Sequence, residues 1–267
     1  MEWEQESELA LRAVSTACMR FEDRPSRAVI GTKEFPRDVV TEQDLRVEEH
    51  LKSALRGSRH PIVAEETAAA TPVPVDCPAW VLDPIDGTAN YARQLHYYGV
   101  SLGLIVMGRD GSLHALTGAV ALPQMRELFF VWGDRTSFLN GNKLTVSDGG
   151  LDSSLVGACF SSGERQTSTR DRQNRIFGAI NDRSAGALRL GSASAQICYT
   201  AAGRLQATYG LGVRLWDVGA SLAIARCAGC HLYVTYRAED RRVDFVVGAP
   251  TPAAEVAAII RKEGITL

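Results

Sequence analysis

Two aspartates, Asp83 and Asp86, stand three residues apart in the segment WVLDPIDGTAN, residues 80–90. Hard cations such as Mg²⁺ take oxygen ligands from a few carboxylates, and two ions about 3.5–4 Å apart need at least one carboxylate that they share. The carbonyl of Ile85, between the aspartates, can supply a further oxygen. Asp, Pro and Gly are also turn formers, so this segment alone predicts either a metal site or a plain turn.

The two residues that follow Asp86 favour phosphate binding. Gly87 and Thr88 open the short helical stretch TANYARQL and would present main-chain N–H groups at its start. A helix N-terminus attracts phosphate because its first N–H groups have no partner within the helix. The turn therefore predicts carboxylates for metal beside amides for phosphate.

Four more acidic residues stand where a metal site can use them. Glu65 and Glu66 end the strand-like run PIVAEE. Asp217 lies at a strand-to-helix junction in RLWDVGA, and Asp44 lies in the first turn of an expected helix. Each has a plainer interpretation. A Glu-Glu pair is usually a solvated face, Asp217 can be an N-cap, and Asp44, three residues after Thr41, can complete a capping box.

The first half of the chain must bring most of these carboxylates together. Apolar residues recur every four positions over residues 3–21, which predicts an amphipathic helix, and a second helix is expected from Thr41. From residue 61 to 147, turn signals such as Asn140-Gly141 separate short β-like runs, which predicts hairpins and a mostly antiparallel sheet. Residues 1–147 are expected to form an N-terminal α+β part. The expected strands are PIVAEE, AWVLD, YYGVSLGLIVM, LHALTGAVAL, ELFFVW and KLTVS.

The sequence Asp148-Gly149-Gly150 marks the expected boundary with a second part, residues 148–267. There, strand-like runs alternate with helical stretches, the pattern of an α/β layer. This part would carry Asp217 and the residues on the substrate side. Its expected helices are residues 171–181, 192–203, 217–229 and 251–263.

Composition excludes several classes of protein. The 267 residues are 45% hydrophobic and 22% charged, which is typical of a globular protein. A net charge of −2 gives no electrostatic reason to expect nucleic-acid binding, which usually shows as a basic stripe on the protein. No apolar run approaches the roughly 18 residues of a membrane helix. With no signal-peptide pattern at the start and six scattered cysteines, the expected location is the cytoplasm, where thiols stay reduced.

Four segments together resemble the inositol monophosphatase family. WVLDPIDGTANY resembles its first signature, and WDVGA followed by AGC resembles its second. AEET matches its Gly-Glu-Glu-Ser/Thr element, and K-x-x-x-x-D-x-V-T-x-x-D, from Lys33 to Asp44, matches its N-terminal element. The resemblance implies a layered αβαβα sandwich with α+β and α/β character. It also implies a homodimer, Mg²⁺ dependence and inhibition by Li⁺.

The same resemblance implies a set of metal ligands. Glu65, Asp83 and the Ile85 carbonyl would hold a first Mg²⁺ ion. Asp83, Asp86 and Asp217 would hold a second, and Glu65 would help to hold a weaker third ion.

The resemblance also implies the roles of the remaining site residues. Thr88 and Asp44 would orient and deprotonate the attacking water, while the amides of Gly87 and Thr88 grip the phosphate. Glu66 would support the metal ligands, and Lys33 would lie on a loop near the site. The residues expected on the substrate side are Ser161, Ser192, Ala193 and Arg214.

Two residues depart from the family pattern on the substrate side. Members selective for inositol phosphates commonly carry a glutamate seven residues before the last metal aspartate, where this chain has Gly210. Arg214 stands where a small or neutral residue or a histidine is usual. Loss of the glutamate together with gain of the arginine favours a substrate with a second anionic group, such as a bisphosphate or a carboxylate. A structural arginine paired to the sheet edge is an equal alternative.

The leading hypothesis is a Mg²⁺-dependent phosphatase of a small cyclitol or sugar phosphate, working through a metal-activated water. Its alternatives are a phosphatase of a sugar or nucleotide bisphosphate, and an inactive relative that binds phosphate or regulates. The segment CAGCH, residues 227–231, fits the pattern of c-type haem attachment. It continues an apolar helix, so its cysteines are expected to be core thiols and haem is not expected.

Overall fold

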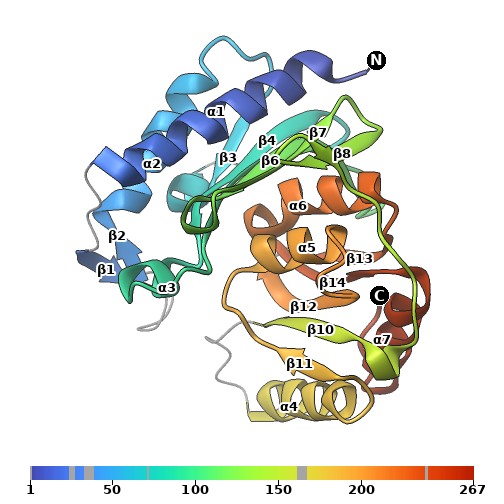
Figure 1. The fold of residues 1–267 in the computed structure, drawn as a ribbon. Helices are drawn as coiled ribbons and strands as arrows, with labels where there is room; N and C mark the ends of the chain where they lie inside the picture. The colour runs from blue at the N-terminus through green and yellow to red at the C-terminus, as the bar shows by residue number, and fades with distance from the viewer. Residues whose placement is uncertain (1, 24–27, 33–38, 71, 161–166, 238–239) are drawn as a thin grey trace.

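A computed structural model of the chain describes residues 2–23, 28–32, 39–70, 72–160, 167–237 and 240–267. Helices and sheets alternate in five layers, as the ribbon shows (Figure 1). The expected αβαβα sandwich is confirmed. The helices are α1 Glu4–Asp23, α2 Glu42–Ala54, α3 Thr88–Ala92, α4 Thr167–Asn181, α5 Ala193–Ala201, α6 Leu215–Ala228 and α7 Pro250–Lys262.

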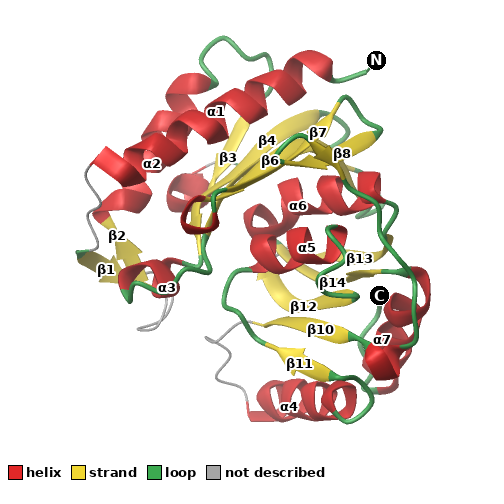
Figure 2. Ribbon diagram, viewed as in Figure 1, coloured by secondary structure: helices red, strands yellow, loops and turns green. Residues whose placement is uncertain are grey.

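The outermost layer is made of α1 and α2, which cover one face of a seven-stranded sheet (Figure 2). The stripe of α1 that faces the sheet is buried and mostly apolar, and Ala10, Val14 and Phe21 are among its residues. Residues three or four apart share one helix face, so this spacing forms a single stripe. The expected helix over residues 3–21 and the second helix after Thr41 are both confirmed.

The seven-stranded sheet runs in the order β3-β4-β5-β6-β7-β8-β9 and is antiparallel except for the parallel pair β3–β4. The prediction of hairpins is confirmed, although β8 was not foreseen. Only the first residue of KLTVS is in a strand, because the chain then leaves the sheet and Val146 N donates to Ala228 O at the end of α6. The strands are β3 Ile62–Ala64, β4 Pro78–Asp86, β5 Gly99–Met107, β6 Leu113–Leu122, β7 Glu127–Trp132, β8 Thr136–Leu139 and β9 Asn142–Lys143.

The second sheet has five strands in the order β11-β10-β12-β14-β13. Its first three strands are parallel and β14 is antiparallel to both of its neighbours. A separate antiparallel pair, β1 Val29–Thr32 and β2 Val39–Thr41, precedes α2. The five strands are β10 Leu155–Phe160, β11 Gly186–Leu188, β12 Ala207–Arg214, β13 His231–Arg237 and β14 Arg242–Gly248.

The helices α5 and α6 lie between the two sheets, and α4 and α7 cover the far face of the second sheet (Figure 1). Helix α6 approaches the first sheet closely because two glycines leave room. A Cβ atom at Gly103 would lie 2.5 Å from Ala220 N, and one at Gly219 would lie 2.3 Å from Val81 Cγ2. This contact carries the first turn of α6 toward the end of β4. No helix in the described ranges is long and apolar enough to cross a membrane.

Candidate functional site

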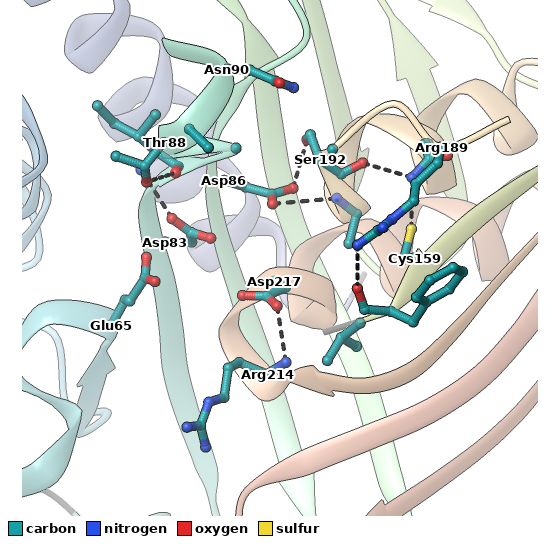
Figure 3. Close-up of a pocket in the computed structure, with 18 of the residues that line it drawn as sticks. Glu65, Asp83, Asp86, Thr88, Asn90, Cys159, Arg189, Ser192, Arg214 and Asp217 are labelled. Atoms are coloured by element: carbon teal, nitrogen blue, oxygen red, sulfur yellow. Dashed lines mark hydrogen bonds between the residues drawn. The ribbon is translucent and has the colours of Figure 1, made fainter. Parts of the chain in front are cut away.

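A cavity of about 300 Å³ opens where elements from both halves of the chain meet (Figure 3). The end of β4 and the start of α3 form one side of it. The end of β10, the turn before α5 and the end of β12 form the other. Ten of the residues expected at the metal and phosphate sites or on the substrate side line it together: Glu65, Asp83, Ile85, Asp86, Gly87, Thr88, Ser192, Ala193, Arg214 and Asp217.

A β-bulge in β4 places both aspartates of the opening motif in this cavity. Residues three apart on a regular strand point to opposite faces. Asp83 pairs with Ser101 and Asp86 with Gly99, so β4 has one residue more than β5 between these two pairs. The extra residue of a bulge re-aims the side chains. Asp83 Oδ1 also accepts from Ile85 N at 2.9 Å, so the turn and the cavity-facing carboxylates occur together.

Asp83 lies in a strongly anionic environment. Burial raises the pKa of Asp83 well above its ordinary value, and the charges of Glu65 and then Asp86 raise it further. Within the described residues, no three His, Cys, Asp or Glu side chains form a ready-made ion cage. The donor set nevertheless fits Mg²⁺, which is commonly bound by one or two carboxylates together with waters and substrate phosphates. A cation here would also relieve the repulsion that raises the Asp83 pKa.

Asp86 is tied to the second half of the chain. Its Oδ2 accepts from Ser192 Oγ at 2.7 Å and from Ser194 N at 2.6 Å, and its Oδ1 accepts from Ala193 N at 3.3 Å. Burial raises the pKa of Asp86, whereas these hydrogen bonds lower it. Ser192 and Ala193 line the cavity as expected, and the structure shows that they also orient Asp86.

Of the two glutamates that follow β3, one lines the cavity and the other lies outside its lining. The strand ends at Ala64, one residue before the expected pair, and a short 3-10 helix, Glu65–Ala70, begins there. Glu65 lines the cavity. Glu66 is not among the cavity-lining residues, and its main-chain N–H donates to Glu48 Oε2 at 2.8 Å.

Asp217 lies in the first turn of α6 and lines the cavity. The N-cap of this helix is Arg214, so the alternative that made Asp217 the N-cap is wrong. Asp217 Oδ2 accepts from Arg214 N at 2.9 Å, which fixes the carboxylate through the main chain of its neighbour.

Asp44 makes the capping contact that the plainer interpretation predicted, and it also contacts a cavity-lining residue. Its Oδ2 accepts from Thr41 N at 2.7 Å, which completes the capping box of α2. Its Oδ1 accepts from Thr88 Oγ1 at 3.1 Å. Asp44 is fully buried, and Thr88, which lines the cavity, lies between it and the open space. Thr88 Oγ1 is also within hydrogen-bond distance, 2.9 Å, of the Ile85 carbonyl.

Gly87 is required at the start of α3. Its φ is +98°, and a Cβ atom there would lie 2.9 Å from Tyr97 O and 3.1 Å from Gly191 O. Asn90, which no sequence motif indicated, donates from Nδ2 to Tyr97 O at 2.6 Å and to Leu190 O at 2.7 Å. The helix ends at Ala92, earlier than the stretch TANYARQL predicts.

Arginines form part of the opposite wall. Arg214 lines the cavity and its Nη1 donates to Asp240 O at 2.8 Å. Burial and then the charge of Arg242 lower the pKa of Arg214. Arg189 and Arg242 line the same cavity. Arg242 was missed because only strand pairing, which no local motif encodes, brings it beside Arg214.

Three expected residues have other outcomes. Lys33 and Ser161 lie outside the described residues. Gly210 lies on β12 away from the cavity lining, and its missing side chain has a packing reason, because a Cβ atom there would lie 2.1 Å from Phe245 Cε1. The cysteines of CAGCH belong to the core as expected. Cys230 is buried, and Cys227 packs against the same apolar cluster.

The fold has close counterparts among solved structures. Mycobacterium tuberculosis SuhB superposes with a TM-score of 0.77 over 98% of both chains at 26% identity. The inositol monophosphatase from Anabaena (Nostoc) sp. PCC 7120 gives 0.80 over 97% of this chain and 96% of that one, at 23% identity. The second likeness concerns the fold alone.

Sequence comparison gives relatives with two kinds of name. The Inositol-1-monophosphatase SuhB of Mycobacterium tuberculosis is 32% identical over 244 residues, which cover 87% of this chain and 81% of that protein. The Nus factor SuhB of Escherichia coli is 30% identical over 205 residues, covering 76% and 74%. The sequence profile of the Inositol monophosphatase family matches residues 3–262. The chain belongs to the inositol monophosphatase family.

Proposed function

We propose that the chain is a Mg²⁺-dependent phosphomonoesterase that hydrolyses a small phosphorylated alcohol with water as the nucleophile. The observation that carries the proposal is the shared cavity, which four carboxylates and the start of α3 line together: Glu65, Asp83, Asp86 and Asp217. Family membership supports a hydrolase. The alcohol is proposed to be a cyclitol or a sugar.

The carboxylates fall into two ligand sets that share Asp83. Glu65, Asp83 and the Ile85 carbonyl would hold one ion, and Asp86 and Asp217 would join Asp83 at the other. Glu65 would help to hold a third ion. When bound, Mg²⁺ supplies Lewis-acid polarisation of the phosphoryl group and charge neutralisation.

The chain's own residues would handle the proton of the attacking water. The Thr88 hydroxyl lies at the cavity wall and donates to Asp44 Oδ1. The water can pass its proton to Thr88 Oγ1 while the Thr88 proton moves to Asp44, so the pair ends with one added proton, on the Asp44 carboxyl. The capping hydrogen bond from Thr41 N keeps Asp44 aimed at Thr88.

Other residues would position the substrate and the ligands. The amides of Gly87 and Thr88, at the start of α3, would hold the phosphate oxygens. Ser192 and Ala193 orient Asp86 from the other half of the chain. Glu66 is proposed to support the site from outside the cavity lining. Lys33, which lies outside the described residues, is proposed to act near the site.

A phosphate-release screen tests the proposal. Purified protein is incubated with inositol, sugar and nucleotide phosphates in Mg²⁺, in EDTA, and in EDTA followed by excess Mg²⁺. We expect hydrolysis that vanishes in EDTA and returns with Mg²⁺, because every proposed ligand is a hard oxygen. Undiminished hydrolysis after exhaustive chelation contradicts the metal mechanism. Lithium inhibition, a homodimer and a cytoplasmic location stay predictions.

A second candidate is a role without catalysis. The Escherichia coli relative carries the name Nus factor rather than that of an enzyme, and by analogy this chain is a candidate for the same role. A variant that loses hydrolysis but stays folded separates the two candidates. If the chain acts as a phosphatase, this variant loses the chain's role in the cell. If the role needs no catalysis, the variant keeps it. The expectation from the net charge, that the chain binds no nucleic acid, stays a prediction.

A further inference from the structure

Arg189 belongs to the cavity wall and lies in the turn between β11 and α5. In the close-up, its side chain lies on the side of Ser192 and Cys159, whereas Glu65 and Asp83 lie on the other side (Figure 3). Arg189 is exposed. The cavity wall therefore carries a solvent-accessible positive charge on the side away from Glu65 and Asp83.

Two uncharged groups of Phe160 hold the Arg189 guanidinium. Arg189 Nη2 donates to Phe160 O at 2.9 Å, and Arg189 Cζ lies 4.2 Å from the centroid of the Phe160 ring. The ring attracts the cation through its negative face, and it packs edge-on against Phe177 of α4, with 6.3 Å between the ring centroids. A carbonyl oxygen and an aromatic ring carry no net charge. These contacts therefore orient the guanidinium without neutralising it.

Arg189 differs in its surroundings from the other two arginines of the cavity. Arg242 Nε lies 3.6 Å from Asp240 Oδ2. The charges of Asp217 and Asp240 act on Arg214. Within the described parts of the chain, by contrast, no carboxylate contacts the Arg189 side chain. Its bond to the carbonyl uses one of five guanidinium N–H groups, so further donors remain for an anion.

The main chain beside Arg189 is fixed from two helices. Asn90 Nδ2, in α3, donates to Leu190 O at 2.7 Å, and Leu190 N donates to Gln196 Oε1, in α5, at 3.4 Å. Gly191 lets Asn90 come this close, because a Cβ atom at Gly191 would lie 2.8 Å from Asn90 Nδ2. The turn that carries Arg189 is therefore tied to α3, the helix whose start is proposed to hold the phosphate that is cleaved.

We propose that Arg189 binds an anionic group of the substrate, a phosphate or a carboxylate, other than the phosphate that is cleaved. This inference rests on the proposed function for the place of the cleaved phosphate, at the start of α3. A guanidinium presents a rigid fork of N–H donors that matches either anion. The substrate is then a bisphosphate or a phosphorylated acid, since a phosphate ester of a neutral alcohol brings no anion to Arg189.

Binding of phosphonates tests the inference without turnover, because a carbon–phosphorus bond is not a phosphate ester. Propylphosphonate, 4-phosphonobutyrate and 1,3-propanediphosphonate share a three-carbon spacer and differ in the group at its far end. Pentylphosphonate, 6-phosphonohexanoate and 1,5-pentanediphosphonate repeat the comparison with a longer spacer. Isothermal titration calorimetry at fixed free Mg²⁺ measures each Kd. We expect at least one two-anion probe to bind about tenfold or more tightly than its one-anion counterpart, the gain of one hydrogen bond between charged groups. The carboxylate and phosphonate arms show which anion is preferred.

Variants assign the effect to Arg189. We expect Arg189→Gln to weaken the preferred two-anion probe about tenfold and to leave the one-anion probe nearly unchanged. Phe160→Leu removes the ring that orients the guanidinium but keeps the carbonyl, so it should weaken the same probe to a smaller extent. Arg175→Gln is the matched control, because it removes an equal charge from an arginine that pairs with Glu263 on the surface. It should change neither probe. Circular dichroism melts check folding, and Arg189→Lys replaces an Arg189→Gln protein that unfolds.

Equal affinity of the wild-type protein for one-anion and two-anion probes at both spacer lengths overturns the inference. So does a tighter two-anion probe whose Kd is the same in Arg189→Gln, and so does an equal loss for both kinds of probe in that variant. The phosphate-release screen separates these results from the proposed function. If no substrate releases phosphate but a two-anion probe binds through Arg189, the phosphatase proposal fails and the anion site stands. If phosphate is released but Arg189→Gln changes no Kd, only the anion site fails.

Discussion

Thr88 Oγ1 lies 3.1 Å from Asp44 Oδ1 and donates a hydrogen bond to it across 44 positions of sequence. The same carboxylate caps α2 through Thr41 N. The contact joins the start of α3, which faces the cavity, to the start of α2, which lies behind it. A capping residue can therefore act on the cavity through one hydroxyl group.

Replacing Asp44 by Asn separates its structural role from its chemical role. Loss of a cap costs about 0.5–2 kcal/mol of stability, which predicts a modest fall in Tm. Asparagine cannot take a proton, and a general base contributes about 10²–10⁴-fold. We expect kcat to fall at least about a hundredfold, measured by phosphate release from protein that is folded at the assay temperature. A variant that melts early yet turns over normally would show that Asp44 is only a cap.

The Thr88→Ala variant should lose turnover to a similar extent, because it removes the hydroxyl that links the cavity to Asp44. The double variant Asp44→Asn/Thr88→Ala is the sharper measurement. When two residues act on the same proton, the effects of substituting them are not additive. We therefore expect the double variant to have nearly the same kcat as the slower single variant. Multiplication of the two losses would mean that the residues act independently.

Asp86→Asn should reduce hydrolysis below about one-tenth of wild type, a barrier increase of about 1.4 kcal/mol or more. The change removes an anionic ligand without changing volume, and the remaining oxygen can still accept from Ser194 N. Ser192→Ala is the matched control, because it removes one hydrogen bond to Asp86 but leaves the carboxylate. We expect the control to lose less activity. An Asp86→Asn variant that retains more than about one-tenth of wild-type hydrolysis would make Asp86 a turn residue rather than a ligand.

Gly210→Ala should destabilise the protein by about 1–3 kcal/mol, the usual cost of overpacking a core, because the new Cβ would lie 2.1 Å from Phe245 Cε1. Gly178→Ala in α4 is the control. A Cβ there meets nothing within 4 Å, so this change should be neutral or stabilise by about 0.4–1 kcal/mol. Thermal melts of the two variants measure the difference. A Gly210→Ala protein as stable as wild type would show that the Phe245 ring moves freely.

Substrate preference provides a further measurement. Gly210 brings no carboxylate to a ring hydroxyl, and Phe245 fills the space beside it. We therefore expect inositol 1-phosphate not to be the best substrate of the screen. Clearly faster phosphate release from inositol 1-phosphate than from sugar phosphates and bisphosphates would contradict this interpretation of Gly210.

The sequence predicted the elements better than their fine geometry. Apolar spacing located α1, and turn signals such as Asn140-Gly141 located the hairpin between β8 and β9 even though β8 itself was missed. Strand β8 has four residues, Thr136–Leu139, and only Ser137 among them is buried, so its sequence carries little apolar alternation. Local pattern therefore identifies long elements and loses short ones.

In the candidate site, too, the sequence indicated the residues but not the contacts that position them. The types and spacing of Asp83 and Asp86 indicated carboxylates at a turn, but the bulge that turns both into one cavity arises from pairing with β5. The hydrogen bonds that orient Asp86 come from residues more than a hundred positions away. Arg242 reaches the cavity only through the register of β12 and β14. Contacts made by strand pairing and helix packing leave no local motif.

The hydrogen bond between Ser194 N and Asp86 spans 108 residues, and that distance has a consequence for the order of folding. Closing so long a loop costs entropy before its contacts repay it. A nascent chain that ends before residue 192 contains every strand of the first sheet, yet Asp86 then lacks all three of these donors. In a refolding experiment, we therefore expect enzymatic activity to return later than the circular dichroism of the helices.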